Sequence, residues 1–135
     1  MGYANRRYDA RIIDNEYILP SESVWSGIIF TSNSVRIALQ ISAVADSGNY
    51  EVGANSLQEI HVSIYPIYYE DVMDTTPVMS KTVSAQLKEG DNGSLEARAT
   101  VFFDVPAIHS MKIQFYNPND WGVWLTVRMS TAEVE

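Results

Sequence analysis

Apolar and polar residues alternate with a period of two along much of this chain. The clearest alternation covers residues 35–45, where the odd positions are all apolar, and residues 60–65 and 123–129 alternate in the same way. Successive side chains of a β-strand point to opposite faces of a sheet, so this period predicts strands with one buried face. Further strands are predicted at residues 11–19, 24–31, 78–87, 101–105 and 108–116, which are rich in β-branched and aromatic residues.

Clusters of Asn, Asp, Ser, Gly and Pro separate these segments at residues 32–34, 46–49, 90–93 and 117–120, as turns require. The sequence Asp91-Asn92-Gly93 is the strongest hairpin signal. No 11-residue window carries an apolar helical stripe. About eight strands joined by turns predict an all-β fold, an antiparallel β-sandwich of jelly-roll or immunoglobulin-like type, and the strand number favours the jelly roll.

Charge divides the chain into two parts. The first eleven residues contain Arg6, Arg7 and Arg11 against Asp9, a formal charge of +2, whereas residues 12–135 carry −10, which together give the net charge of −8. We therefore predict a basic N-terminal arm, residues 1–11, poorly ordered in the isolated protein, ahead of a single β-sandwich domain, residues 12–135. The acidic body argues against nucleic acid as a partner, because phosphate binding needs a clustered basic surface.

Composition excludes several other classes of protein. The chain has no cysteine, so disulfides and thiolate chemistry are excluded. No run of about 18 apolar residues is present, so we expect no membrane-spanning helix. Residues 1–20 lack the apolar stretch of a secretory signal. The remaining composition is that of a globular domain large enough to bury its own core.

Candidate chemistry is sparse. His61 and His109 are isolated from other metal ligands, and no serine lies in a Gly-x-Ser-x-Gly elbow. The acidic cluster at residues 70–74 and the turn at residues 117–120 could supply oxygen ligands to calcium, although neither has EF-hand spacing. We expect a protein that is not an enzyme, with no catalytic residue, metal or cofactor.

Several aromatic residues fall on the polar phase of their strands. Trp124 alternates with Val123 and Leu125, while Tyr65 and Tyr69 are out of phase with the apolar series from residue 60 to residue 64. Three interpretations remain open: a platform that stacks on sugars, a protein interface, where Trp, Tyr and Arg are over-represented, or packing within the fold.

The layout of most of the chain resembles that of the small β-sandwich decoration (cement) proteins of tailed-phage capsids. The resemblance lies in the polar start, the entry Asp14-Asn15-Glu16-Tyr17-Ile18-Leu19-Pro20-Ser21, the alternating segments 35–42 and 60–65, the strand ending Phe102-Phe103-Asp104-Val105-Pro106, and the closing hairpin of residues 111–129. It implies a homotrimer on the outer surface of the virion, made in the host cytoplasm, that binds across subunits of the major capsid protein and stabilises the head.

On this interpretation, the partner-binding residues are Arg6, Arg7, Arg11, Tyr65, Tyr69 and Trp124. The arginines would contact acidic capsid surface, and the aromatic residues would lie at subunit or capsid contacts. The alternative is a carbohydrate-binding module with an aromatic platform. Residues 115–124 resemble the end of galactose-binding-like discoidin domains, which favours that alternative over a short stretch of the chain.

Overall fold

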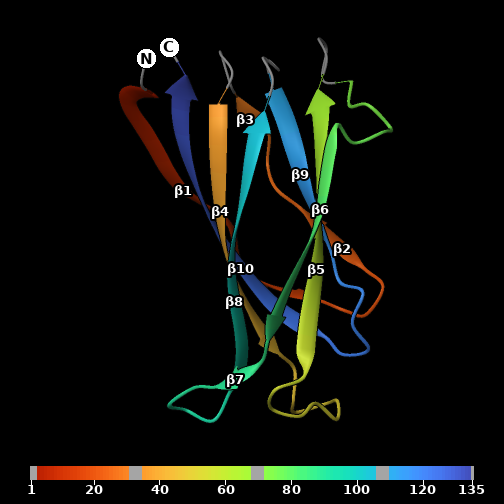
Figure 1. The fold of residues 1–135 in the computed structure, drawn as a ribbon. Coiled ribbons are helices and arrows are strands. Elements are labelled where there is room, and N and C mark those ends of the chain that lie inside the picture. The colour runs from red at the N-terminus through yellow and green to blue at the C-terminus, as the bar shows by residue number, and fades with distance from the viewer. Residues whose placement is uncertain (1–2, 31–34, 68–71, 106–109, 135) are drawn as a thin grey trace.

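The computed structural model describes residues 3–30, 35–67, 72–105 and 110–134 (Figure 1). Within these residues all regular structure is β-strand, arranged in two antiparallel sheets of five strands. The predicted all-β antiparallel sandwich is therefore confirmed. No helix in the described part of the chain has the length and hydropathy that crossing a membrane would need.

The order of strands within the two sheets defines the topology. The first sheet is ordered β1 (Tyr3–Ile18), β10 (Val123–Val134), β4 (Val35–Ala45), β8 (Leu95–Val105) and β7 (Lys88–Glu89). The second sheet is ordered β2 (Ser23–Trp25), β9 (Ser110–Tyr116), β5 (Leu57–Ile67) and β6 (Met79–Gln86), with β3 (Ile29–Phe30) also paired to β9. Consecutive strands mostly alternate between the sheets, which is the jelly-roll arrangement.

The strand count agrees with the prediction of about eight once the short strands are placed. Strands β2 and β3 lie one after the other along β9, so together they fill a single position. Strand β7 pairs only Lys88 and Glu89 with the beginning of β8. The remaining strands supply the other positions of an eight-stranded jelly roll.

The segment at residues 24–31, predicted as one strand, divides at Ser26. The Ser26 backbone nitrogen donates to the Ile113 carbonyl at 2.9 Å, but the Ile113 nitrogen donates back to the Ser26 hydroxyl, also at 2.9 Å. A side-chain oxygen thus replaces the backbone carbonyl of the ladder. The regular pairing with β9 stops there and resumes at Ile29.

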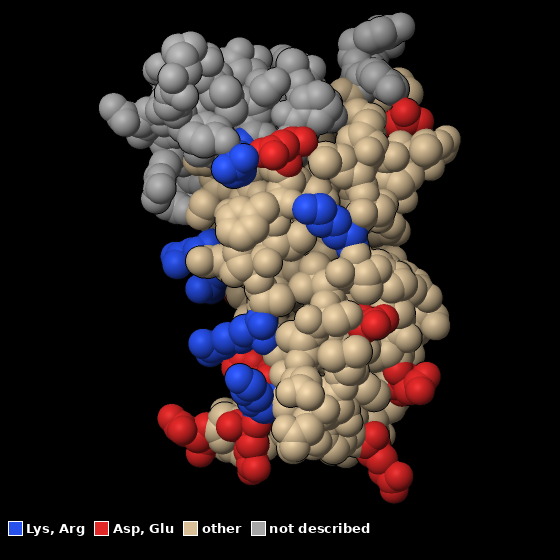
Figure 2. All heavy atoms as spheres, viewed as in Figure 1, with Lys and Arg blue, Asp and Glu red and all other residues tan. Residues whose placement is uncertain are grey.

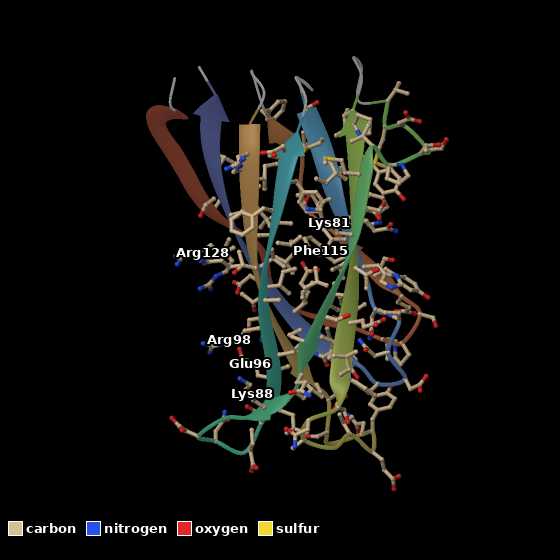
Figure 3. The ribbon with its side chains drawn as sticks, viewed as in Figure 1. Lys81, Lys88, Glu96, Arg98, Phe115 and Arg128 are labelled. Atoms are coloured by element: carbon tan, nitrogen blue, oxygen red, sulfur yellow. The ribbon has the colours of Figure 1, made fainter. Side chains whose placement is uncertain are left out.

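The hydrophobic core lies between the two sheets and follows the alternation in the sequence. Ile37, Leu39 and Ile41 of β4 point inward and are at most 4% exposed, as are the odd-numbered residues of β10 from Val123 to Met129. Phe115 of β9 is fully buried and lies between the sheets (Figure 3). Burial of this continuous apolar layer holds the two sheets together.

Residues 3–11 belong to strand β1, whereas the sequence predicts a poorly ordered arm. Tyr3 lies opposite Val134 and Arg11 opposite Arg128, so this part of the chain pairs along the length of β10. Backbone hydrogen bonds to an open strand edge need no apolar side chains, which explains why a polar segment can form a strand. The pairing is irregular, with register shifts between Tyr3 and Arg7 and on either side of Ile13. A separate role of residues 1–11 in docking stays a prediction.

The hairpin predicted at residues 91–93 is confirmed between β7 and β8. Gly90 donates its N–H to the Ser94 carbonyl at 2.8 Å, and Gly93 has a φ of +80°. A positive φ strains residues with a side chain, so glycine at position 93 suits this turn.

Candidate functional site

Three arginines from separate parts of the sequence lie on the outer face of the first sheet. Arg11 is on β1, Arg128 on β10 and Arg98 on β8, and each alternates with inward-facing neighbours. Together with Gln40, Ser42 and Thr126 they line a shallow depression of about 630 Å³. We call this surface, formed by Arg11, Arg98, Arg128, Gln40, Ser42 and Thr126, the basic face.

The register of the strands brings two of these arginines directly opposite each other. Arg11 pairs with Arg128 across β1 and β10, and Thr126 and Arg98 both pair with Ser42 of β4. Like charges placed opposite each other across a strand pair destabilise a sheet. The fold itself gains nothing from the pair Arg11–Arg128, and an anion bound between the two guanidinium groups would relieve their repulsion.

The carboxylates near the basic face neutralise only part of its charge. Arg11 lies 3.2 Å from Asp14 and Arg98 lies 2.8 Å from Glu96, whereas Arg128 makes no ion pair within the described residues. The Arg98 guanidinium and a hydrogen bond from Ser42 lower the pKa of Glu96, so this carboxylate stays charged. Both arginines are largely exposed to water, which weakens their ion pairs and leaves the guanidinium groups accessible to a partner.

Two more cations extend the positive charge along the same sheet. Lys88 of β7 lies opposite Glu96, and Arg36 of β4 binds Asp104 at 2.9 Å. Figure 3 shows Arg128, Arg98 and Lys88 projecting from the sandwich on one side. Figure 2 shows Lys and Arg side chains gathered along this flank, while Asp and Glu concentrate toward the lower end.

Trp124 lies on the same outer face, at the beginning of β10. It is 41% exposed, and its ring packs on Tyr17 of β1 with centroids 4.7 Å apart at 51°. The Tyr17 hydroxyl donates to the Asp46 carboxylate at 2.5 Å. The Tyr17 hydroxyl lies directly over Gly122. A Cβ added at position 122 would come within 2.0 Å of the hydroxyl oxygen, so only glycine fits beneath the Tyr17 ring.

The hydrogen bond between Tyr17 and Asp46 predicts a pH-dependent loss of stability in Tyr17→Phe. Hydrogen bonds from Asn49 and then from Tyr17 lower the pKa of Asp46 below its ordinary value of 3.8. A carboxyl with a lowered pKa stabilises the folded state above that ordinary value and loses this contribution as pH falls below it. We expect Tyr17→Phe to lower the Tm by several degrees at pH 7, and the difference from the parent protein to shrink below about pH 4.

Thermal unfolding of both proteins between pH 3 and pH 7 measures this difference. Tyr116→Phe is the matched control, because the Tyr116 hydroxyl makes no hydrogen bond within the described part of the chain, and its Tm should match that of the parent. Equal Tm values for Tyr17→Phe and the parent at pH 7 would contradict the role given to this hydrogen bond.

The structure places the residues that the sequence predicts for partner binding on both sheets. Arg11 and Trp124 share the outer face of the first sheet, but Tyr65 lies on β5 in the second sheet. Tyr65 is half-buried and donates its hydroxyl to the Gln114 side chain at 3.3 Å. Tyr69 and the side chains of Arg6 and Arg7 lie outside the described residues, so the structure assigns them no contact.

The turn considered for calcium has a structural role instead. Asn117 is fully buried and donates its amide to the carbonyls of Ile18 and Trp121. Asn119 donates to the Glu59 carbonyl at 2.7 Å and accepts from the Glu59 N–H at 3.0 Å. These side chains are occupied by backbone groups. Among the described residues no group of three His, Cys, Asp or Glu is arranged to hold a metal ion.

Arg98 and Arg128 are interface candidates that were not predicted from the sequence. Both are cations on the polar phase of predicted or observed strands, so their exposure could be inferred from the alternation. Their proximity to Arg11 could not be inferred from the sequence, because it depends on which strands become neighbours in the sheet.

The fold and the basic face define a jelly-roll domain with three arginines gathered on the outer surface of one sheet. No protein-family model and no curated protein matches the sequence. Among solved structures the chain is similar to VP2 in the subviral particle of infectious bursal disease virus, with a TM-score of 0.53 and 11% identity over 96% of this chain and 32% of VP2. A structure of the infectious bursal disease virus Gx strain gives a TM-score of 0.54, with 12% identity over 97% of this chain and 33% of the matched viral chain.

A second kind of protein shares the fold. A family GH115 4-O-methyl-α-glucuronidase with specificity for decorated arabinogalactans matches with a TM-score of 0.53 and 12% identity, over the whole of this chain and 18% of the enzyme. This chain thus spans about a third of VP2 and less than a fifth of the glucuronidase. At such low identity these similarities show the jelly-roll fold alone, which is shared by a viral capsid protein and a carbohydrate-active enzyme.

Proposed function

We propose that this protein is a capsid decoration protein of a tailed phage, which attaches to the outside of the head through its basic face. It acts as a structural protein that catalyses no reaction and needs no cofactor. The observation that carries the proposal is the direct opposition of Arg11 and Arg128 on an exposed sheet, with Arg98 beyond them. Such an arrangement lowers the stability of the free protein and favours the binding of an anionic partner.

The partner that fits this surface is an acidic region of the major capsid protein. Carboxylates can bind the planar guanidinium groups in a bidentate manner, and so fix the orientation of the attached domain. The chain carries a net charge of −8 although the basic face contributes three arginines, so the remaining residues are acidic in sum and would be repelled by the same acidic surface. Attraction on one face and repulsion from the others therefore steer the protein into one orientation.

A homotrimer would strengthen this attachment. In a closed cyclic oligomer several copies of a weak basic face bind equivalent capsid subunits at once, so that avidity makes the overall affinity much higher than that of one copy. Trp124, exposed at one end of the same outer face, is the aromatic residue best placed for a subunit or capsid contact. The location that follows is the outer surface of the virion, after synthesis in the host cytoplasm.

Cosedimentation with purified phage heads that lack decoration tests this proposal. We expect the protein to sediment with the heads at low ionic strength, to be released as salt increases, and to raise the temperature at which the heads break open. Light scattering of the free protein should give the mass of a trimer at high concentration. If the protein stays in the supernatant at every salt concentration, the proposal is wrong.

A further inference from the structure

The outer face of the second sheet, on the opposite side of the sandwich from the basic face, carries an ordered group of aromatic and amide side chains. Trp25 of β2, Gln114 and Tyr116 of β9, and His61 and Tyr65 of β5 all alternate with inward-facing residues. Gln114 lies opposite Trp25 on one side and opposite Ser63 on the other. We call these five residues, Trp25, His61, Tyr65, Gln114 and Tyr116, the aromatic face.

The rings of the aromatic face form two packed pairs. Trp25 packs on Tyr65 with centroids 5.0 Å apart at 52°, and His61 stacks on Tyr116 at 5.6 Å and 27°. Trp25 is still 37% exposed, and the other three rings are half-buried. Each ring is thus held in place by a neighbour while part of its surface stays open to a ligand.

A chain of hydrogen bonds fixes the polar groups between the rings. Tyr65 donates its hydroxyl to the Gln114 Oε1 atom at 3.3 Å, and Gln114 donates its Nε2 atom to the Ser23 hydroxyl at 3.3 Å. The amide keeps one N–H and one oxygen lone pair for a further partner. Lys112, opposite Tyr65, makes no ion pair or hydrogen bond within the described residues and adds a cationic donor.

We propose that the aromatic face binds a neutral, hexose-containing glycan. A pyranose ring presents C–H groups on one face and hydroxyl groups around its edge, and the aromatic face offers rings beside a fixed amide and hydroxyls. Ligand sites of this kind combine aromatic surface with a few placed polar groups. A neutral ligand suits this surface, because the five residues of the aromatic face include no acidic group and the arginines of the basic face lie on the other sheet.

This site goes beyond the proposed attachment to the capsid and does not depend on it. With the basic face on the head, the opposite sheet of the sandwich would face outward, where it could bind glycans at a bacterial surface. A protein interface at the aromatic face is the competing outcome, and it predicts that changes there reduce binding to phage heads.

Saturation-transfer NMR with cellohexaose, mannohexaose and galactohexaose tests the proposal. We expect transfer to the ring protons of at least one of the three, and a loss of affinity of about tenfold or more in Trp25→Ala. Trp124→Ala, the same change on the opposite sheet, should bind the oligosaccharide like the parent protein. Gln114→Glu replaces the amide donor without removing a ring, and it should also weaken oligosaccharide binding. It therefore tests the glycan site even if Trp25→Ala fails to fold.

Three outcomes would overturn the glycan site. The first is that none of the three oligosaccharides binds to the parent protein at millimolar concentration. The second is that Trp25→Ala or Gln114→Glu binds the oligosaccharide as tightly as the parent. The third is that these variants lose binding to phage heads while their glycan binding is unchanged. Failure of the parent protein to sediment with heads, by contrast, would count only against the capsid attachment.

Discussion

Arg128→Glu is expected to weaken binding to phage heads by on the order of 100-fold while leaving the fold as stable as the parent or slightly more so. In the parent protein Arg128 lies opposite Arg11, and the two like charges repel. A glutamate at position 128 would lie opposite Arg11 as an ion pair. The same carboxylate would repel an acidic capsid surface, so docking and stability should change in opposite directions.

Cosedimentation and thermal unfolding of the same sample measure both effects. Lys112→Glu is the matched control, because it makes the same change of charge on the other sheet, and it should bind heads about as well as the parent. A destabilised Arg128→Glu protein would show that Arg128 supports the fold. Equal loss of binding in Arg128→Glu and Lys112→Glu would mean that net charge, and not the basic face, governs attachment.

Asn117→Ala is expected to be the most destabilising single change outside the apolar core. The Asn117 amide donates to the Ile18 carbonyl at 3.0 Å and to the Trp121 carbonyl at 2.9 Å, while its oxygen accepts two hydrogen bonds from Asn119. One fully buried side chain therefore ties the end of β1 to the β9–β10 turn. Alanine would leave these backbone groups without partners in a buried site, which costs about 3 kcal/mol or more.

Denaturant unfolding gives this free energy directly, and the Tm should fall by roughly 10 °C. Asn92→Ala is the matched control, since Asn92 accepts hydrogen bonds from Ser94 in an exposed hairpin turn, and its loss should cost less than about 1 kcal/mol. If Asn117→Ala also costs less than about 1 kcal/mol, the network around Asn117 is not important for stability.

The sequence predicted strands β4 and β6 closely, but it placed the beginnings of strands β1 and β8 too late in the chain. The prediction for residues 35–45 matches β4 at both ends, and the segment at residues 78–87 differs from β6 by one residue at each end. Strand β1 begins eight residues before its predicted start, because a polar segment pairs through its backbone. The division at Ser26 depends on one hydroxyl reaching the Ile113 N–H, which no local pattern reveals.

By itself, the sequence determined the all-β class, the inward and outward phase of the main strands, and the exposure of individual cations and aromatic residues. These properties follow from the period of two, which acts between residues close in the chain. The tertiary structure alone decided that Arg11, Arg98 and Arg128 share one sheet, that Tyr65 lies on the other, and that Asn117 is a buried link. Strand order joins residues about a hundred positions apart, and it depends on how two sheets bury their apolar faces together, so the alternation within any one strand cannot specify it.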